Sequence, residues 1–91
     1  MEIMEELYNV VMDRKANPVE GSYTNYLLNK GTEKIAKKVG EEAVETAIAA
    51  AKKSKEEVIG EIADLEYHIL VLMADMGITL EDVSKELKNR R

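Results

Sequence analysis

Apolar residues recur at helical spacing along most of the chain, and this pattern predicts a protein built from α-helices. The first helix is indicated by four apolar residues spaced i, i+4, i+7 and i+8, namely Ile3, Leu7, Val10 and Val11. We expect this helix to run from residue 2 to about residue 15, because Asn17 and Pro18 follow and interrupt helical structure.

Two longer helices are predicted in the centre of the chain. From about residue 32 to residue 53, five residues recur at helical spacing: Ile35, Val39, Ala43, Ala47 and Ala50. Ser54 and Glu57 have capping-box spacing, so a second long helix should begin there and end before Gly77. Because only a tight turn near Lys53 separates the two helices, we expect them to be antiparallel neighbours.

Shorter elements are expected on both sides of this hairpin. The irregular segment 17–31 contains three helix breakers, Pro18, Gly21 and Gly31. Within it, Ser22 is a candidate N-cap for a short helical turn that reaches Leu28. Near the carboxyl end, Thr79 and Asp82 are placed to cap a last helix. The predicted fold is therefore all-α, with residues 1–91 forming a single domain.

The composition agrees with an all-α fold and indicates self-association. The chain is 45% hydrophobic and 34% charged, with one proline and no Trp, Phe or Cys. A domain of 91 residues buries only a modest share of its apolar surface when it folds alone. Residues 69–73 are also apolar in nearly every direction around the helix axis. We therefore expect a homodimer whose helices complete a larger bundle.

The charge and hydropathy of the chain exclude several classes of partner. A formal net charge of −5 argues against nucleic acid, whose binding depends largely on Lys and Arg at the phosphates. The amino terminus does not have the features of a signal peptide, and the longest apolar stretch, residues 69–74, is too short to span a membrane. We expect a cytoplasmic protein that reaches anionic small molecules through a bound metal ion.

Four acidic residues on the predicted hairpin form the clearest candidate site. Glu42 and Glu45 on the first long helix, and Glu61 and Asp64 on the second, are each spaced i, i+3 and so share one face of their helix. Glu45 and Glu61 each lie about 12 Å along their helices from the turn at Lys53, and Glu42 and Asp64 lie opposite each other at a greater, matching distance. Four carboxylates that meet there would repel one another unless a cation were bound, and oxygen ligands favour Mg²⁺, Mn²⁺ or Ca²⁺. The alternative is an ordinary solvated acidic face.

Other polar residues are weaker candidates. His68 lies one turn beyond Asp64 and opposite Lys38, where it would face a phosphate at the rim of the site, although a lone histidine is more often a structural side chain. A group of lysines precedes Glu41 and offers charge for anionic oxygens: Lys30, Lys34, Lys37 and Lys38. The chain has four aromatic residues, which we expect to pack rather than to stack on a base: Tyr8, Tyr23, Tyr26 and Tyr67.

The segments KIAKKVGEEAVETAIAA and EIADLEYHILVLMADMGI resemble the phosphoribosyl-ATP pyrophosphohydrolase family of histidine biosynthesis. The resemblance begins at SYTNYLLNKGTEKI and covers residues 22 to about 78. Within it, EExxE followed by ExxD is similar to the metal signature of the all-α nucleoside-triphosphate pyrophosphatase (MazG-like) superfamily. Glu66 departs from the family pattern, because an apolar residue is expected there. The chain resembles the stand-alone form, without a fused phosphoribosyl-AMP cyclohydrolase.

This resemblance implies the hydrolysis of phosphoribosyl-ATP to phosphoribosyl-AMP and pyrophosphate. It implies Mg²⁺ as cofactor, with Mn²⁺ as a possible substitute, and four metal ligands: Glu42, Glu45, Glu61 and Asp64. Glu41 is expected to orient the attacking water or a second ion. Catalysis would then rest on metal and positioning rather than on a side-chain nucleophile. The residues that we expect to bind phosphate or ribose are Ser22, Thr24, Lys30, Lys34, Lys38 and His68.

Two other functions stay open at this point. The chain is also compatible with a house-cleaning pyrophosphatase for canonical or damaged nucleoside triphosphates, which would share the acidic residues but not the SYTNYLLNKG and YHILVL segments. The second alternative is a non-enzymatic helical dimerisation module whose carboxylates are only a solvated surface. Such a module would show no response to divalent metal.

Overall fold

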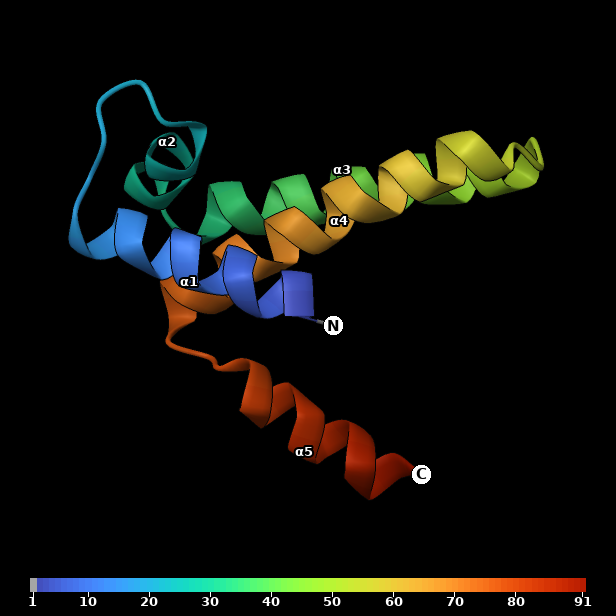
Figure 1. Ribbon diagram of the computed structural model, residues 1–91. Coiled ribbons are helices and arrows are strands. Elements are labelled where there is room, and N and C mark those ends of the chain that lie inside the picture. The colour runs from blue at the N-terminus through green and yellow to red at the C-terminus, as the bar shows by residue number, and fades with distance from the viewer. Residues whose placement is uncertain (1) are drawn as a thin grey trace.

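The computed structural model describes residues 2–91, and this part of the chain consists of helices without any strand (Figure 1). The helices are α1 (Glu2–Ala16), α2 (Tyr23–Lys30), α3 (Thr32–Ala51), α4 (Lys55–Met76) and α5 (Leu80–Arg90). The predicted all-α fold class is confirmed. None of the helices in the described residues is long and apolar enough to cross a membrane.

Helices α3 and α4 form a long antiparallel hairpin, as predicted (Figure 1). The turn between them centres on Lys53, whose φ of 58° lies in the left-handed region. The hydroxyl of Ser54 accepts a hydrogen bond from the backbone N–H of Glu57 at 3.3 Å and so caps α4. At its other end, α4 stops at Gly77, whose φ of 70° allows the left-handed C-cap. The register of the hairpin therefore follows from local turn and capping residues.

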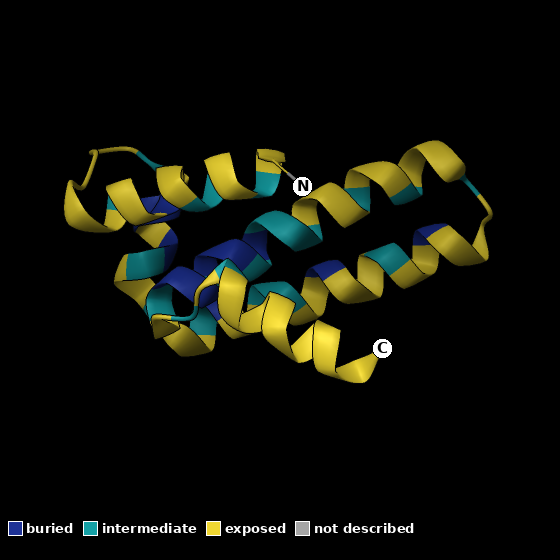
Figure 2. Cartoon of the chain, turned by 60° about the horizontal axis from the view of Figure 1, so that its bottom comes forward, coloured by how far each residue is buried: buried dark blue, intermediate teal, exposed yellow. Residues whose placement is uncertain are grey.

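The core lies where α1 and α2 pack against the half of the hairpin that is farther from its turn (Figure 2). Helices α1, α2, α3 and α4 each contribute at least one fully buried side chain to the core: Val11, Leu27, Ile35, Leu70 and Val71. The apolar run 69–73 is thus buried or half-buried by the chain's own helices. Its burial does not require a partner subunit, contrary to our expectation from the sequence.

Polar side chains of α1 hold this helix against the carboxyl end of α4. Lys15 Nζ donates a hydrogen bond to the carbonyl of Ala74 at 2.8 Å, and Tyr8 Oη donates to the carbonyl of Ile78 at 2.7 Å. Ala74 lies in the last turn of α4, and Ile78 follows Gly77 directly after the helix, so both bonds tie α1 to this end of α4. The contact fixes α1 across the end of α4.

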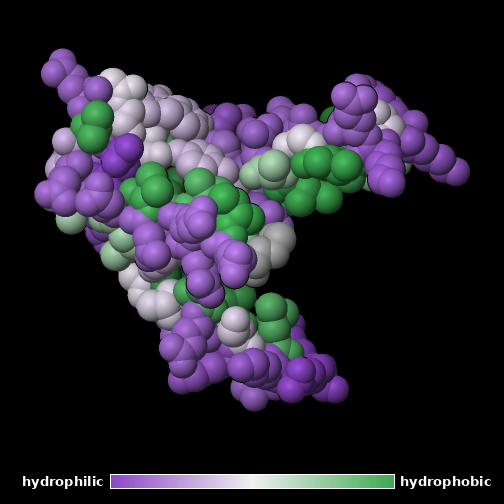
Figure 3. Space-filling view, viewed as in Figure 1, coloured by the Kyte–Doolittle hydropathy of each residue, from purple (hydrophilic) through white to green (hydrophobic). Residues whose placement is uncertain are grey.

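The turn end of the hairpin and helix α5 extend away from the core (Figures 1 and 2). Large apolar side chains are exposed on both, namely Val44, Ile48, Ile59, Ile62, Val83 and Leu87. Figure 3 shows hydrophobic surface on the hairpin arm and on α5, facing the open space between them. The capping box of Thr79 and Asp82 is present as predicted, but the apolar side of α5 is left largely uncovered.

Replacement of Ile35 by Ala tests the position of the core. Ile35 is fully buried, so Ile35→Ala should lower the free energy of unfolding by about 2–5 kcal/mol, through lost apolar contact and the cavity left behind. Ile3 is 52% exposed, and Ile3→Ala should change the free energy by no more than about 0.5 kcal/mol. Urea denaturation followed by circular dichroism measures both. Equal losses in the two variants would contradict this assignment of the core.

Candidate metal and substrate site

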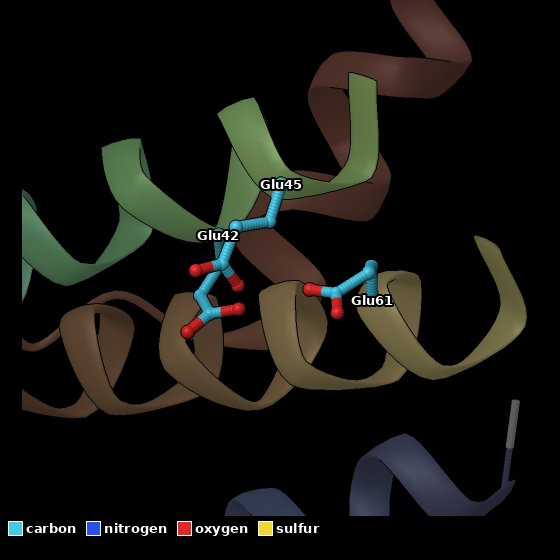
Figure 4. A group of neighbouring side chains, drawn as sticks. All are labelled: Glu42, Glu45 and Glu61. Atoms are coloured by element: carbon cyan, nitrogen blue, oxygen red, sulfur yellow. The ribbon is translucent and has the colours of Figure 1, made fainter. Parts of the chain in front are cut away.

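Three of the predicted carboxylates meet between the long helices. Glu42 and Glu45 extend from α3 toward α4, and Glu61 extends from α4 toward them (Figure 4). One oxygen atom from each of the three residues lies within 4.8 Å of the others. We call these residues the carboxylate trio. They meet because the i, i+3 spacing places Glu42 and Glu45 on one face of α3, and the antiparallel register brings Glu61 opposite.

The trio contains two oxygen atoms without a partner. Glu42 is only 7% exposed, and the Oε2 atoms of Glu42 and Glu61 are buried with no hydrogen-bond donor among the described residues. A buried polar atom without a partner is costly, and more so when its group is charged. These two atoms are the strongest local indication that the site binds something that the protein itself does not supply.

The electrostatics of the trio favour a bound cation. Burial raises the pKa of Glu42, with further contributions from a hydrogen bond with Glu45 and from the charges of Glu45 and Asp64. The pKa of Glu61 is also raised, first by a hydrogen bond with Glu45, then by burial and the neighbouring acids. The charges of the neighbouring acids thus add to both shifts, behind burial for Glu42 and behind the hydrogen bond with Glu45 for Glu61. A divalent ion would reverse this effect, because its charge favours the ionised acids.

Asp64 lies beside the trio but not within it. Its carboxylate is not among the oxygens that come within 4.8 Å of one another, so the structure brings together three of the four predicted ligands. Asp64 and two members of the trio, Glu45 and Glu61, line the same open hollow of about 390 Å³. The charge of Asp64 also raises the pKa values of Glu42 and Glu61. Asp64 therefore faces the site at its rim.

The donor set fits a hard divalent cation. All the candidate ligands are carboxylate oxygens, which Mg²⁺, Mn²⁺ and Ca²⁺ prefer and which zinc and copper sites seldom use alone. The exposed positions of Glu45 and Asp64 leave room for water or phosphate oxygens around an ion. Mg²⁺ in particular keeps several such ligands.

Lys38 is the predicted phosphate-binding lysine that lies nearest the trio. Its Nζ atom is 3.9 Å from Oε1 of Glu42 and 3.8 Å from Oε1 of Glu41. Glu41 is half-exposed and faces this lysine rather than joining the trio. The lysine thus brings one positive charge to the edge of an acidic site.

His68 is buried, with both ring nitrogens occupied. Its Nδ1 atom lies 2.7 Å from the carbonyl oxygen of Asp64, and its Nε2 atom lies 3.0 Å from the hydroxyl of Tyr23. A carbonyl only accepts, so Nδ1 carries a proton, and in the neutral imidazole Nε2 then accepts from Tyr23. In this arrangement neither nitrogen is free for the phosphate contact that we expected from the sequence. Tyr23, which we expected only to pack, is the residue that the sequence analysis missed.

The remaining candidates for substrate binding are Lys34 on α3 and three residues of segment 21–31. The side chains of those three, Ser22, Thr24 and Lys30, contact other groups of the protein. This segment is mostly helix α2 rather than a loop. The hydroxyl of Ser22 caps α2, accepting from the backbone N–H of Asn25 at 3.2 Å, and Thr24 is buried and hydrogen-bonded to the hydroxyl of Tyr67. The ammonium group of Lys30 lies over the Tyr26 ring, 5.7 Å from its centroid. Lys34 is half-buried on α3, one turn before Lys38. None of the four predicted residues lines the hollow beside the trio.

An all-α hairpin with an oxygen-only carboxylate cluster defines a protein suited to binding phosphate groups through a divalent cation. Comparison with protein families gives a more specific result. The model of the family described as phosphoribosyl-ATP pyrophosphohydrolase matches residues 4–91. This chain therefore belongs to the phosphoribosyl-ATP pyrophosphohydrolase family, which confirms the resemblance seen in the sequence.

Individual relatives agree with this family. The phosphoribosyl-ATP pyrophosphatase of Clostridium acetobutylicum is 57% identical over 98% of this chain and 81% of the relative. That of Listeria innocua is 54% identical over 97% of this chain and 84% of the relative. A histidine biosynthesis bifunctional protein of Caldanaerobacter subterraneus subsp. tengcongensis is 53% identical over 99% of this chain but only 44% of the relative. The similarity thus extends along nearly the whole of this chain.

The raised pKa values of Glu42 and Glu61 predict a pH-dependent response to metal. Protons compete with a cation for these carboxylates, and above their raised pKa values the ionised trio destabilises the metal-free protein. At pH 8, Mg²⁺ at about tenfold its dissociation constant should raise the melting temperature by on the order of 5–10 °C. Near the ordinary glutamate pKa of 4.5, the increase should be much smaller.

Thermal melts with Mg²⁺ and with EDTA, at pH 8 and at pH 5, measure this response. In the metal-free protein, the contribution of these two acids to stability should fall as the pH rises from 4.5 through their raised pKa values, because the folded state binds more protons over that range. A metal-induced increase that is the same at both pH values would contradict the assignment of the trio as the metal site.

Proposed function

We propose that this chain hydrolyses phosphoribosyl-ATP to phosphoribosyl-AMP and pyrophosphate, an early step of histidine biosynthesis, with Mg²⁺ as cofactor. The proposal is supported by membership of the family across residues 4–91 and by the names of relatives that are 50–57% identical. The observation that carries the chemistry is the carboxylate trio, with its two unpartnered buried oxygens. Lys38 offers one positive charge to these three acids, so without a further cation the ionised trio would destabilise the hairpin that holds it.

Glu42, Glu45 and Glu61 would hold the ion, and Asp64 at the rim would complete or share its coordination. When bound, Mg²⁺ supplies positive charge and Lewis acidity at the oxygens of the triphosphate; Mn²⁺ is the natural substitute. The hollow lined by Glu45, Glu61 and Asp64 opens to solvent and offers a place for the phosphates. Hydrolysis adds water to one phosphorus and releases pyrophosphate, so the protein's task is to position groups and to balance charge.

Lys38 and Glu41 have supporting roles in this proposal. Lys38 is already paired with two acids, and a triphosphate that approaches the trio would offer its ammonium group stronger anionic partners. If Lys38 turned toward phosphate, Glu41 would lose its cation and become available to accept a proton from water. These roles do not require a side-chain nucleophile. The other predicted contacts, from Ser22, Thr24, Lys30, Lys34 and His68, would need α2 or these side chains to move on binding.

A substrate assay tests the proposed function. The protein should convert phosphoribosyl-ATP to phosphoribosyl-AMP and pyrophosphate with Mg²⁺, and should turn over dATP and dCTP far more slowly, as chromatography of the products would show. Glu45→Gln and Asp64→Asn should each lower kcat by roughly 100-fold, because each removes a charged metal ligand. Glu33→Gln, an exposed change at the start of the same helix as Glu45, should keep kcat within about twofold.

The outcomes of this assay separate the alternatives. Rapid hydrolysis of a deoxynucleotide without hydrolysis of phosphoribosyl-ATP would replace the proposal by a house-cleaning pyrophosphatase. No hydrolysis of any nucleotide, together with melting temperatures that Mg²⁺ does not change, would favour a non-enzymatic helical module.

We also propose that the chain acts as a homodimer. Its radius of gyration is 14.0 Å, whereas a compact domain of this length should have about 12 Å. The excess comes from the hairpin arm and from α5, which are the elements that expose apolar residues (Figure 3). A second copy that packed against these surfaces would remove them from water and complete a larger bundle.

Light scattering tests the dimer directly. The wild-type protein should have twice the chain mass of 10.2 kDa at micromolar concentration. Ile48 is 52% exposed on the arm, so Ile48→Glu should shift the mass toward that of one chain without preventing folding. The same change at Ile3, which is also 52% exposed but lies on α1, serves as the control. A wild-type protein with the mass of a single chain would contradict the dimer.

A further inference from the structure

A short chain of hydrogen bonds connects helix α2 to the turn of α4 that carries Asp64. We propose that Tyr23 is a positioning residue for the metal site, acting through the ring of His68 on the backbone of Asp64. This inference rests on the metal site proposed above. It gives a role to a residue that belongs neither to the carboxylate trio nor to the predicted phosphate contacts.

The direction of each hydrogen bond follows from the chemistry of the groups. The carbonyl of Asp64 accepts from Nδ1 of His68 at 2.7 Å, so in the neutral imidazole Nε2 accepts a hydrogen bond from the Tyr23 hydroxyl at 3.0 Å. The same carbonyl is the one that accepts the backbone N–H of His68 in a regular helix. The tyrosine thus holds the imidazole, and the imidazole holds the helical turn between residues 64 and 68.

The imidazole has little freedom to move between these two bonds. His68 is 6% exposed, and its ring meets two tyrosine rings edge-on. The centroid of the Tyr23 ring is 5.7 Å away at an interplanar angle of 78°, and that of the Tyr67 ring is 5.2 Å away at 83°. The hydroxyl of Tyr67 is in turn hydrogen-bonded to Thr24 on α2. A displacement of α2 would therefore be passed to the turn of α4 instead of being absorbed by a loose side chain.

This connection bears on the one predicted ligand that lies outside the trio. The Asp64 side chain is exposed at the rim of the hollow, so its reach toward an ion depends on where its backbone turn lies. Burial raises the pKa of the Tyr23 phenol, and the charges of Lys38 and Glu42 also act on it. Groups that orient a metal ligand from outside the coordination sphere commonly alter metal affinity when they are removed.

The hydroxyl of Tyr23 can be separated from the packing of its ring. Tyr23 is 45% exposed, and its ring stacks with those of Tyr26 and Tyr67 at centroid distances of 6.1 and 6.3 Å. Phenylalanine would keep these contacts and lose only the hydrogen bond to His68. Tyr26 is also 45% exposed, and its hydroxyl has no hydrogen-bond partner among the described residues. Tyr26→Phe is therefore a matched control for Tyr23→Phe.

The test measures Mn²⁺ binding to the whole protein without substrate, from the electron paramagnetic resonance signal of free Mn²⁺. Tyr23→Phe should raise the dissociation constant about three- to tenfold and lower kcat for phosphoribosyl-ATP at limiting Mg²⁺, with KM nearly unchanged. Tyr26→Phe should match the wild type in each quantity. The urea midpoints of both variants should stay close to that of the wild type, which separates positioning from folding.

A double variant tests the path through the imidazole. In a His68→Gln background, Tyr23→Phe should have no further effect on Mn²⁺ affinity, because both changes break the same connection. Wild-type affinity in Tyr23→Phe, or equal losses in Tyr23→Phe and Tyr26→Phe, would overturn the positioning role and leave the metal site standing. Absence of Mn²⁺ binding by the wild type would overturn both the metal site and this inference.

Discussion

Repulsion among three carboxylates is the constraint on which the rest of this structure depends. Glu42, Glu45 and Glu61 are held with oxygens within 4.8 Å of one another, and two of their oxygens are buried without a partner. The hairpin that carries these acids is held together elsewhere, by the core that α1 and α2 build at its other end. The stable core and the acidic site thus lie at different places along the hairpin. A cation bound at the site would offset the repulsion among the carboxylates.

Much of the fold could be predicted from local signals in the sequence. Ser54, Gly77 and the Thr79–Asp82 pair mark helix ends through capping chemistry, and the structure places the helices of the hairpin within about two residues of the predicted bounds. The meeting of the trio could also be predicted. The i, i+3 spacing places each acidic pair on one face of its helix, and the three-residue turn limits which positions of α3 and α4 lie opposite each other. Spacing alone does not determine the side-chain reach of Asp64, which lies at the rim instead of among the other three.

What the sequence could not reveal depends on contacts between distant residues. Tyr23 and His68 are separated by 45 positions, and no periodicity or motif within either segment indicates that one donates a hydrogen bond to the other. The same holds for Thr24, whose hydroxyl we expected at phosphate but which is buried against Tyr67. The apolar run 69–73 pointed to a partner subunit, yet the chain's own helices cover it; the uncovered apolar residues lie on the hairpin arm and on α5 instead. Hydrophobic periodicity shows which face of a helix is apolar, but not which element covers it.

We propose that the trio holds a divalent ion on which the pyrophosphohydrolase activity depends. Crystals grown with Mn²⁺ and measured near the manganese absorption edge would test it most directly, since anomalous scattering locates the ion itself. We expect an anomalous peak within bonding distance of an oxygen from each of Glu42, Glu45 and Glu61, with Asp64 bonded to the ion directly or through water. An ordered trio without any anomalous peak at saturating Mn²⁺, or Mn²⁺ bound only elsewhere on the chain, would contradict it.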